Sequence, residues 1–166
     1  MKTAQRNFFF KVRFILFTVL FFFAACQSLP VQGEKNTVVT HDGWALTIEH
    51  LPSLSPQVKR KYPILICHGL AANRQYFKLK DDDSLVRALQ NAGYDVWLMD
   101  LRGRNDAGET GFFFGKHTYK YDIDDYITQD LDAAIRFVQK ETGAPKINYM
   151  GHSMGGIIMH ARLGSY

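Results

Sequence analysis

The sequence predicts an α/β fold in which a mostly parallel sheet is covered by crossover helices. Two apolar runs of strand length, residues 62–68 and 94–100, are rich in branched and aromatic side chains, as expected of strands covered on both faces. Between and after them lie segments whose apolar residues recur at helical spacing. This alternation of strands and helices is typical of parallel sheets. At 166 residues the chain has room for one domain.

Residues 1–25 have the pattern of a signal peptide. Their charges are all positive and lie at Lys2, Arg6, Lys11 and Arg13. An uncharged apolar run of 12 residues, 14–25, has the length of a signal core and is shorter than the roughly 20 residues of a membrane-spanning helix. Without the four leader cations, 16 Lys and Arg balance 16 Asp and Glu. The mature part therefore offers no electrostatic basis for binding nucleic acid.

Cys26 follows the small pair Ala24-Ala25, a pattern that resembles a bacterial lipobox. In such signals the cysteine thiol receives a diacylglyceryl group and becomes the first residue of the mature protein. We therefore expect an exported lipoprotein, held at a membrane of the bacterial cell envelope through Cys26. Periplasmic release, secretion or a retained anchor are the alternatives, because Phe23 departs from the aliphatic residue usual at that position. Cys67 ends an apolar run and is expected to be a buried small hydrophobe.

The folded domain is predicted to span residues 37–166. Residues 26–36 are polar, contain Pro and Gly, and are predicted to form a tether. In residues 37–50, two β-prone runs flank Asp42-Gly43, a dipeptide that favours a tight hairpin turn. The domain is therefore expected to begin with an antiparallel hairpin.

Two helices are predicted between the later strands. The first, residues 81–93, begins with acids and a serine, ends at a glycine, and has one apolar face formed by Leu85, Ala88, Leu89 and Ala92. The second, residues 122–143, has acids early and Lys140 late, which suits the helix dipole. Its apolar stripe consists of Ile127, Leu131, Ala134, Ile135 and Val138.

A fifth strand, residues 146–151, leads directly into Gly151-His152-Ser153-Met154-Gly155, where another helix is predicted to begin. The pattern G-x-S-x-G at a strand-to-helix junction places the serine on a strained turn, and side chains two residues before or after it would collide with the neighbouring strand and helix. The turn lifts the hydroxyl above the sheet edge and aims the first helical N–H groups at what binds there. Ser153 is the predicted nucleophile, supported by Gly151, His152 and Gly155.

His68-Gly69-Leu70 follows the strand of residues 62–68, where an acyl-transfer enzyme of this architecture needs a loop N–H to complete its oxyanion hole. The predicted donors are the N–H groups of Leu70 and Met154, with His68 and Gly69 shaping the loop. The alternative is that His68-Gly69 only ends a strand and that Ser153 is only a helix cap, since serine is a favoured cap residue.

Together these residues resemble the α/β-hydrolase-fold lipases and esterases, most of all the acid-lipase branch. The resemblance covers residues 37–166 and is carried by "HDGWALTIEHLP", "ILICHGLAANRQYF", "LQNAGYDVWLMDLRG" and "GHSMGG". It implies hydrolysis of a lipid or small-molecule carboxylic ester with a hydrophobic acyl group, by a Ser-His-Asp triad without metal or organic cofactor. It also assigns residues 100–103 to folding of a loop. Residues 104–121 depart from the tighter loop of many relatives, and Phe112 to Phe114 either touch acyl chains or pack under that loop.

The catalytic acid and histidine follow the serine in this fold, yet the 13 residues after Ser153 contain no Asp or Glu. His160, the one histidine there, is expected two turns along the helix and facing away; His41, His50 and His117 are expected to be solvated. Without a base Ser153 is a poor nucleophile. We therefore expect an inactive N-terminal part of a serine ester hydrolase, truncated after the nucleophile strand and the start of its helix. The alternative is a non-catalytic lipoprotein or decayed gene product that keeps only the scaffold.

Overall fold

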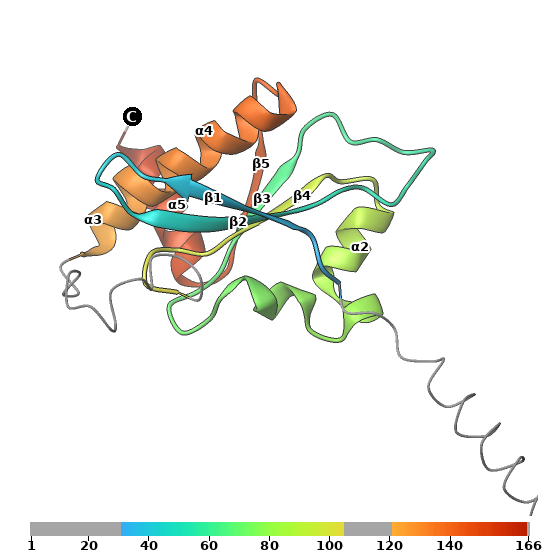
Figure 1. Ribbon diagram of the computed structural model, residues 1–166, viewed down its shortest axis with the longest axis horizontal. Helices are drawn as coiled ribbons and strands as arrows, with labels where there is room; N and C mark the ends of the chain where they lie inside the picture. Colours follow the sequence, from blue (N-terminus) through green and yellow to red (C-terminus); the bar gives the residue numbers. More distant parts are fainter. Residues whose placement is uncertain (1–30, 105–120, 166) are drawn as a thin grey trace, which may run out of the picture. The chain divides into compact units, whose positions relative to one another are not determined.

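The computed structural model describes residues 31–104 and 121–165, which form a mixed sheet with helices on both faces (Figure 1). The strands are β1 (Glu34–Val39), β2 (Ala45–Leu51), β3 (Ile64–Cys67), β4 (Val96–Met99) and β5 (Asn148–Gly151). Their order in the sheet is β1-β2-β4-β3-β5. β1, β2 and β4 pair antiparallel, whereas β4, β3 and β5 run parallel. The predicted hairpin followed by parallel strands is confirmed, with β3 and β4 in the middle.

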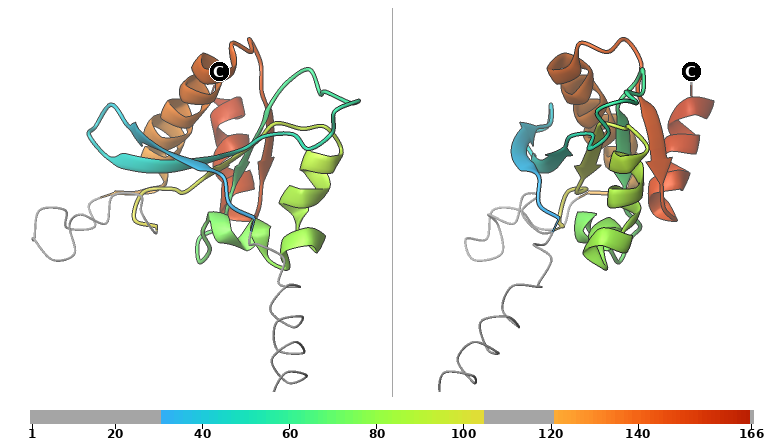
Figure 2. Two further views of the ribbon diagram at one scale, coloured as in Figure 1. Left: turned by 45° about the vertical axis from the view of Figure 1, so that its right-hand side comes forward. Right: turned by 90° about the vertical axis from the view of Figure 1, so that its right-hand side faces the viewer.

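The helical elements follow the strands in the predicted alternation. They are η2 (Arg74–Lys78), η3 (Asp81–Asp83), α2 (Leu85–Asn91), α3 (Ile123–Asp125), η5 (Tyr126–Asp130), α4 (Leu131–Thr142) and α5 (Met154–Gly164). Figure 1 and both views of Figure 2 show α2 on one side of the parallel strands and α4 with α5 on the other. Helices on both faces bury the parallel strands, as the apolar runs predicted.

Alternate residues of the central strands divide between two cores. One face of β3 and β4 carries Leu65, Cys67, Trp97 and Met99 and packs against the buried residues of α4 and α5. The other face carries Ile64, Ile66, Val96 and Leu98 and packs against Val86 of α2. Each strand therefore contributes to both layers through the two-residue period of its side chains.

The hairpin turn between β1 and β2 forms at the predicted place. Thr40 N–H donates to Trp44 O at 2.8 Å, and Gly43 takes φ 90°, a conformation that glycine adopts freely. The predicted boundary at residue 37 differs from the structure, because β1 begins at Glu34 and Val31 is buried in the core. Part of the first strand therefore lies in the segment that was predicted to be a polar tether. Its polar, exposed side chains have no apolar alternation that would predict a strand.

The first helix turns a different face to the sheet from the one predicted. Val86 and Gln90 are buried, Leu89 is half-buried, and Leu85 and Ala88 are exposed. Gln90 tolerates burial because its side-chain N–H donates to Pro52 O at 2.7 Å. The predicted buried face of the helix was therefore wrong by one residue.

The second predicted helix is confirmed in its stripe and its ends. Leu131, Ala134 and Val138 are buried in the core. Asp122 and Asp125 form a reciprocal capping box at the start of α3, and Gly143 ends α4 with φ 65°. Within residues 31–104 and 121–165, no helix has the length and apolar character to cross a bilayer. The predictions for the leader, Cys26 and residues 112–117 lie outside the described residues.

Candidate active site

Ser153 stands at the turn between β5 and α5 with φ 51° and ψ −117°. A non-glycine residue with these angles carries backbone strain of about 1–3 kcal/mol. Its side chain makes no capping hydrogen bond to the helix that it precedes. The interpretation of Ser153 as only a helix cap is therefore wrong, since a cap serine has extended backbone angles and bonds a helical N–H.

The glycines that flank the serine stand where backbone atoms leave no room for a side chain. A Cβ atom on Gly155 would lie 2.6 Å from Cys67 O and 2.8 Å from His68 O, both at the end of β3. A Cβ atom on Gly151 would lie 2.4 Å from the carbonyl carbon of Gly155. The collisions inferred from the sequence pattern are present, so this spacing of glycines is a steric requirement of the turn.

The loop after β3 lies directly against the serine. A Cβ atom on Gly69 would lie 3.1 Å from Ser153 Cβ and 3.2 Å from His152 Nδ1. Next to it, Leu70 is 58% exposed. Among the described residues, no hydrogen bond engages the N–H of Leu70 or that of Met154, the first residue of α5. The two candidate oxyanion donors thus follow directly after Gly69 and Ser153, two residues that lie against each other.

His68 joins the ends of two strands and is fully buried. Its Nε2 accepts the N–H of Leu101 at 3.2 Å, and its Nδ1 donates to Gly69 O at 2.7 Å. Burial lowers the pKa of the imidazole, which agrees with a neutral ring protonated at Nδ1. Because both ring nitrogens are engaged by backbone groups, His68 supports the loop and has no free nitrogen for a proton from Ser153.

The other histidines in the described ranges also stand away from the hydroxyl. His152 is exposed and lies beside the Tyr76 ring, with 5.1 Å between ring centroids. His41 and His160 are exposed, as expected. No hydrogen bond between Ser153 Oγ and a histidine ring occurs in residues 31–104 and 121–165. These ranges therefore contain no base positioned to activate the serine.

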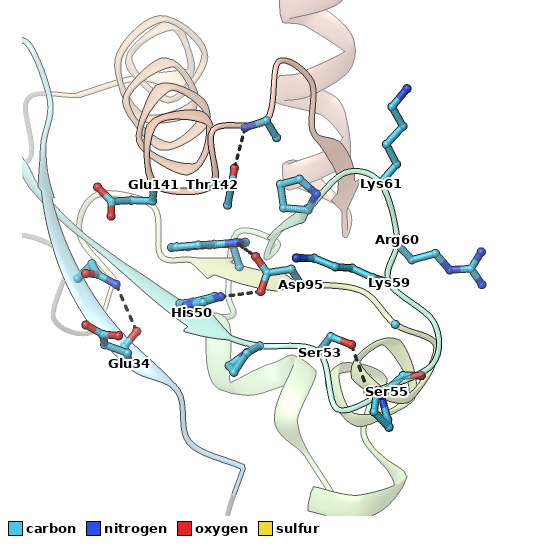
Figure 3. Close-up of a pocket in the computed structure, with 17 residues that line it drawn as sticks. Glu34, His50, Ser53, Ser55, Lys59, Arg60, Lys61, Asp95, Glu141 and Thr142 are labelled. Carbon is cyan, nitrogen blue, oxygen red and sulfur yellow. Dashed lines mark hydrogen bonds and ion pairs between the residues drawn. The ribbon is translucent and has the colours of Figure 1, made fainter.

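The prediction that His50 is solvated holds only in part, because its side chain is 26% exposed. Its Nε2 lies 2.6 Å from Asp95 Oδ1, and its ring stacks on Trp97 with 4.0 Å between centroids. His50 and Asp95 face each other in a surface cavity of about 670 Å³ (Figure 3). The cavity adjoins Asp95 and Pro63, at the starts of the parallel strands, whereas Ser153 follows the end of β5. His50 and Ser153 consequently lie at opposite ends of the sheet.

Two other chemistries find no support in this part of the molecule. Cys67 is fully buried, as predicted, and burial raises the pKa of its thiol to about 12, so it has no thiolate for nucleophilic attack at neutral pH. No group of three or more His, Cys, Asp or Glu side chains in residues 31–104 and 121–165 is arranged to hold a metal ion.

Sequence reasoning missed a buried charge network beneath the loop that carries Leu70. It joins Arg74 and Lys78 of η2 to Glu49 of β2 and Asp100 after β4. The available signal was Glu49, a carboxylate two residues before the buried Leu51 and therefore on the same face of β2. A buried carboxylate requires partners, but the sequence does not say which of its many cations supplies them.

A strained serine at a strand-to-helix turn, with a loop from the neighbouring strand against it, defines the nucleophile-elbow class of α/β folds. The sequence matches the family described as alpha/beta hydrolase fold over residues 62–166, and the partial alpha/beta-hydrolase lipase region over residues 24–81. The chain belongs to the α/β hydrolase fold family and carries the N-terminal region of its acid-lipase branch.

Similar proteins include lipases and an esterase. The chain is 32% identical to gastric triacylglycerol lipase of Rattus norvegicus over 131 residues, which is 75% of this chain and 33% of the relative. It is 31% identical to the Homo sapiens gastric triacylglycerol lipase over 132 residues, 76% of this chain and 33% of the relative. A solved esterase from Pyrococcus furiosus shares the fold, with TM-score 0.57 and 19% identity, over 76% of this chain and 42% of that one. The chain spans about a third of the length of the curated relatives that it matches.

Proposed function

We propose that the protein to which this chain belongs is a serine ester hydrolase with Ser153 as its nucleophile. The observation that carries the proposal is the backbone of Ser153, which holds a φ of 51° without using its hydroxyl as a cap. A strained conformation persists where the surrounding structure enforces it, and such residues cluster at active sites. A scaffold without catalytic function would gain stability from glycine at this position, so the strain favours the enzyme over the scaffold interpretation.

The proposed reaction is acyl transfer in two steps. Ser153 Oγ attacks the ester carbonyl carbon, the bond to the alcohol breaks, and the hydroxyl proton passes through a base to the departing alkoxide. Water then attacks the acyl carbon, the bond to Ser153 Oγ breaks, and a proton from the water passes through the base to Oγ as the acid leaves. The N–H groups of Leu70 and Met154 receive the negative charge that develops on the carbonyl oxygen. A donor of this kind contributes roughly 10²- to 10³-fold in rate.

The base and its acid partner are proposed to come from outside residues 31–104 and 121–165. In the family's chain order both follow the serine, and the segment after Ser153 contains no carboxylate side chain. His68 is already engaged by two backbone groups, and His160 is exposed along α5. This chain is thus proposed to supply the nucleophile and the oxyanion donors, and the proton acceptor is proposed to come from residues outside the described ranges.

Esters with hydrophobic acyl groups are the proposed substrates, lipid esters in particular. The gastric lipases that resemble this chain carry triacylglycerol in their names. Beside the elbow, a surface cavity of about 470 Å³ is lined by mostly apolar or aromatic side chains, among them Tyr76, Phe77, Leu79, Leu85, Met150 and His152. Apolar surface next to the nucleophile suits an acyl chain better than a charged group.

The test uses the protein at its native length and an alkyl fluorophosphonate, which phosphonylates activated serines. We expect one adduct per chain, located at Ser153 by peptide mass spectrometry, with parallel loss of p-nitrophenyl ester hydrolysis. Among p-nitrophenyl esters, butyrate and longer chains should react with higher kcat/KM than acetate. An adduct on another residue, or failure to hydrolyse any ester of the series, would contradict the proposal and favour the non-catalytic scaffold.

We also propose that the mature protein is anchored through a lipid on Cys26, on the basis of the leader pattern. In a lipoprotein-competent bacterium, radiolabelled palmitate should enter the protein, and the protein should fractionate with membranes. Cys26→Ser should abolish both, because the thiol that accepts the diacylglyceryl group is gone. Cys67→Ala, at the other of the two cysteines, is the matched control and should retain the label. Unchanged labelling in Cys26→Ser would rule out this anchor.

A further inference from the structure

The loop that carries Leu70 is buried at its first residue, Gly69, which lies against Ser153, and is held by hydrogen bonds on either side of its exposed part. It spans residues 69–73, between β3 and η2. Leu70 is exposed, and a hydrogen bond from Ala72 N–H to Gly69 O at 3.2 Å closes the turn. At its first end, His68 binds the Leu101 N–H. Leu70 and Ala71 are exposed and gain little from packing, so their position depends on the contacts made on either side of them.

Arg74 holds the second end through two carboxylates from different strands. Its N–H donates to Asp100 Oδ1 at 2.7 Å, and its Nη1 donates to Asp100 Oδ2. Its Nε donates to Glu49 Oε2 at 3.1 Å. The backbone and the side chain of Arg74 therefore connect the loop to Asp100 after β4 and to Glu49 of β2.

The partners of Arg74 are themselves fully engaged. Lys78 Nζ donates to both oxygens of Glu49, at 2.7 and 2.8 Å, and Gly33 N–H donates to Glu49 Oε1 at 2.8 Å. Arg74, Glu49 and Asp100 are at most 1% exposed, and Lys78 is 8% exposed. Two basic and two acidic side chains thus form a network away from water, where charge-assisted hydrogen bonds are strong and directional.

We propose that Arg74 is the positioning residue of the oxyanion hole, because its clamp on Glu49 and Asp100 fixes the loop that places the Leu70 N–H beside Ser153. This inference rests on the proposed function. Arg74 follows Leu70 by four residues, so a shift of its backbone reaches the donor directly. A displacement of about 1 Å in a catalytic group costs up to roughly 10²-fold in rate. Lysine cannot replace it, since a single ammonium lacks the planar fork that binds two carboxylates at once.

The same fold supplies a matched control in Arg102. Arg102 is also 1% exposed and also bridges two carboxylates, with Nε 2.8 Å from Asp130 Oδ1 and Nη1 2.7 Å from Asp42 Oδ2. It ties the hairpin turn to η5 and makes no hydrogen bond to residues 69–73 among those that the structure describes. Arg102→Lys therefore disturbs a buried network of the same kind without touching the oxyanion loop.

The experiment compares Arg74→Lys and Arg102→Lys in the native-length protein. Arg74→Lys should lower kcat for p-nitrophenyl butyrate about 30-fold with KM within about threefold, because an oxyanion donor acts mainly in the transition state. The affinity for a trifluoromethyl ketone, which forms a tetrahedral adduct with the serine, should fall by the same factor as kcat/KM. Arg102→Lys should keep kcat within about threefold. Thermal melting of both variants reports whether their stabilities are comparable.

The inference is overturned if Arg74→Lys lowers kcat no more than Arg102→Lys does, or if the loss lies in KM alone. Activity that survives Ser153→Ala would instead reject the proposed function, so the two failures are distinguishable. Should Arg74→Lys not fold, Glu49→Gln weakens the same clamp while keeping an oxygen for Gly33 N–H, and Asp42→Asn is its control. The same comparison then tests the inference: Glu49→Gln should lower kcat more than Asp42→Asn does, with little change in KM.

Discussion

Replacing Ser153 with alanine is expected to lower kcat for ester hydrolysis by about 10⁴- to 10⁶-fold, the scale seen when an activated nucleophile is removed. Alanine removes Oγ but leaves the N–H groups of Leu70 and Met154 in place, so KM should change little and a residual rate above that of water should remain. The measurement is steady-state kinetics on p-nitrophenyl butyrate with the native-length protein.

Ser165→Ala is the control for Ser153→Ala. Ser165 lies at the exposed end of α5, where its hydroxyl bonds only nearby helix carbonyls. Its removal should leave kcat within about twofold, as is usual for surface substitutions. A Ser153→Ala variant that retains activity within tenfold of wild type would place the nucleophile elsewhere.

The elbow could be predicted from the sequence because its constraint is local. Gly151 and Gly155 lie two residues on either side of Ser153, and both the strand before them and the helix after them have readable periodicity. Steric exclusion at those two glycines follows from the turn itself, whatever the remainder of the chain does. The parallel direction of β3, β4 and β5 was predictable for a related reason, since a helix between two strands favours a parallel pair.

The charge network could not be predicted, because its partners are distant in sequence. Arg74 and Asp100 are 26 residues apart, and Arg74 and Glu49 are 25 apart. From the sequence alone, Arg74 and Lys78 have the pattern of solvent-exposed charges in a loop. They are buried only because the folded chain places them against Glu49 of β2 and Asp100 after β4. Pairing of buried charges is set by tertiary geometry, which local propensity does not encode.

His50 and Gln90 show the same limit on a smaller scale. His50 was expected to be solvated, and Gln90 was not among the residues expected on the buried face of its helix. In the structure each bonds a partner from another element: His50 Nε2 lies 2.6 Å from Asp95 Oδ1, and Gln90 Nε2 donates to Pro52 O, while the buried Gln90 Oε1 has no hydrogen-bond partner among the described residues. Hydrogen-bond partners from other elements favour the burial of a polar side chain, and the sequence alone does not reveal these partners.

Gly155→Ala is expected to lower the free energy of unfolding by about 3 kcal/mol or more, as overpacking against backbone does at its upper range. The added Cβ would meet Cys67 O at 2.6 Å and His68 O at 2.8 Å, and these are backbone atoms of β3 and of the residue that starts the oxyanion loop. Gly164→Ala, in the same helix, meets no atom within 4 Å. Because alanine is the better helix former by up to about 1 kcal/mol, Gly164→Ala should be neutral or stabilising. Urea unfolding of both variants measures the difference, and equal stabilities within about 0.5 kcal/mol would mean that the elbow can relax around a methyl group.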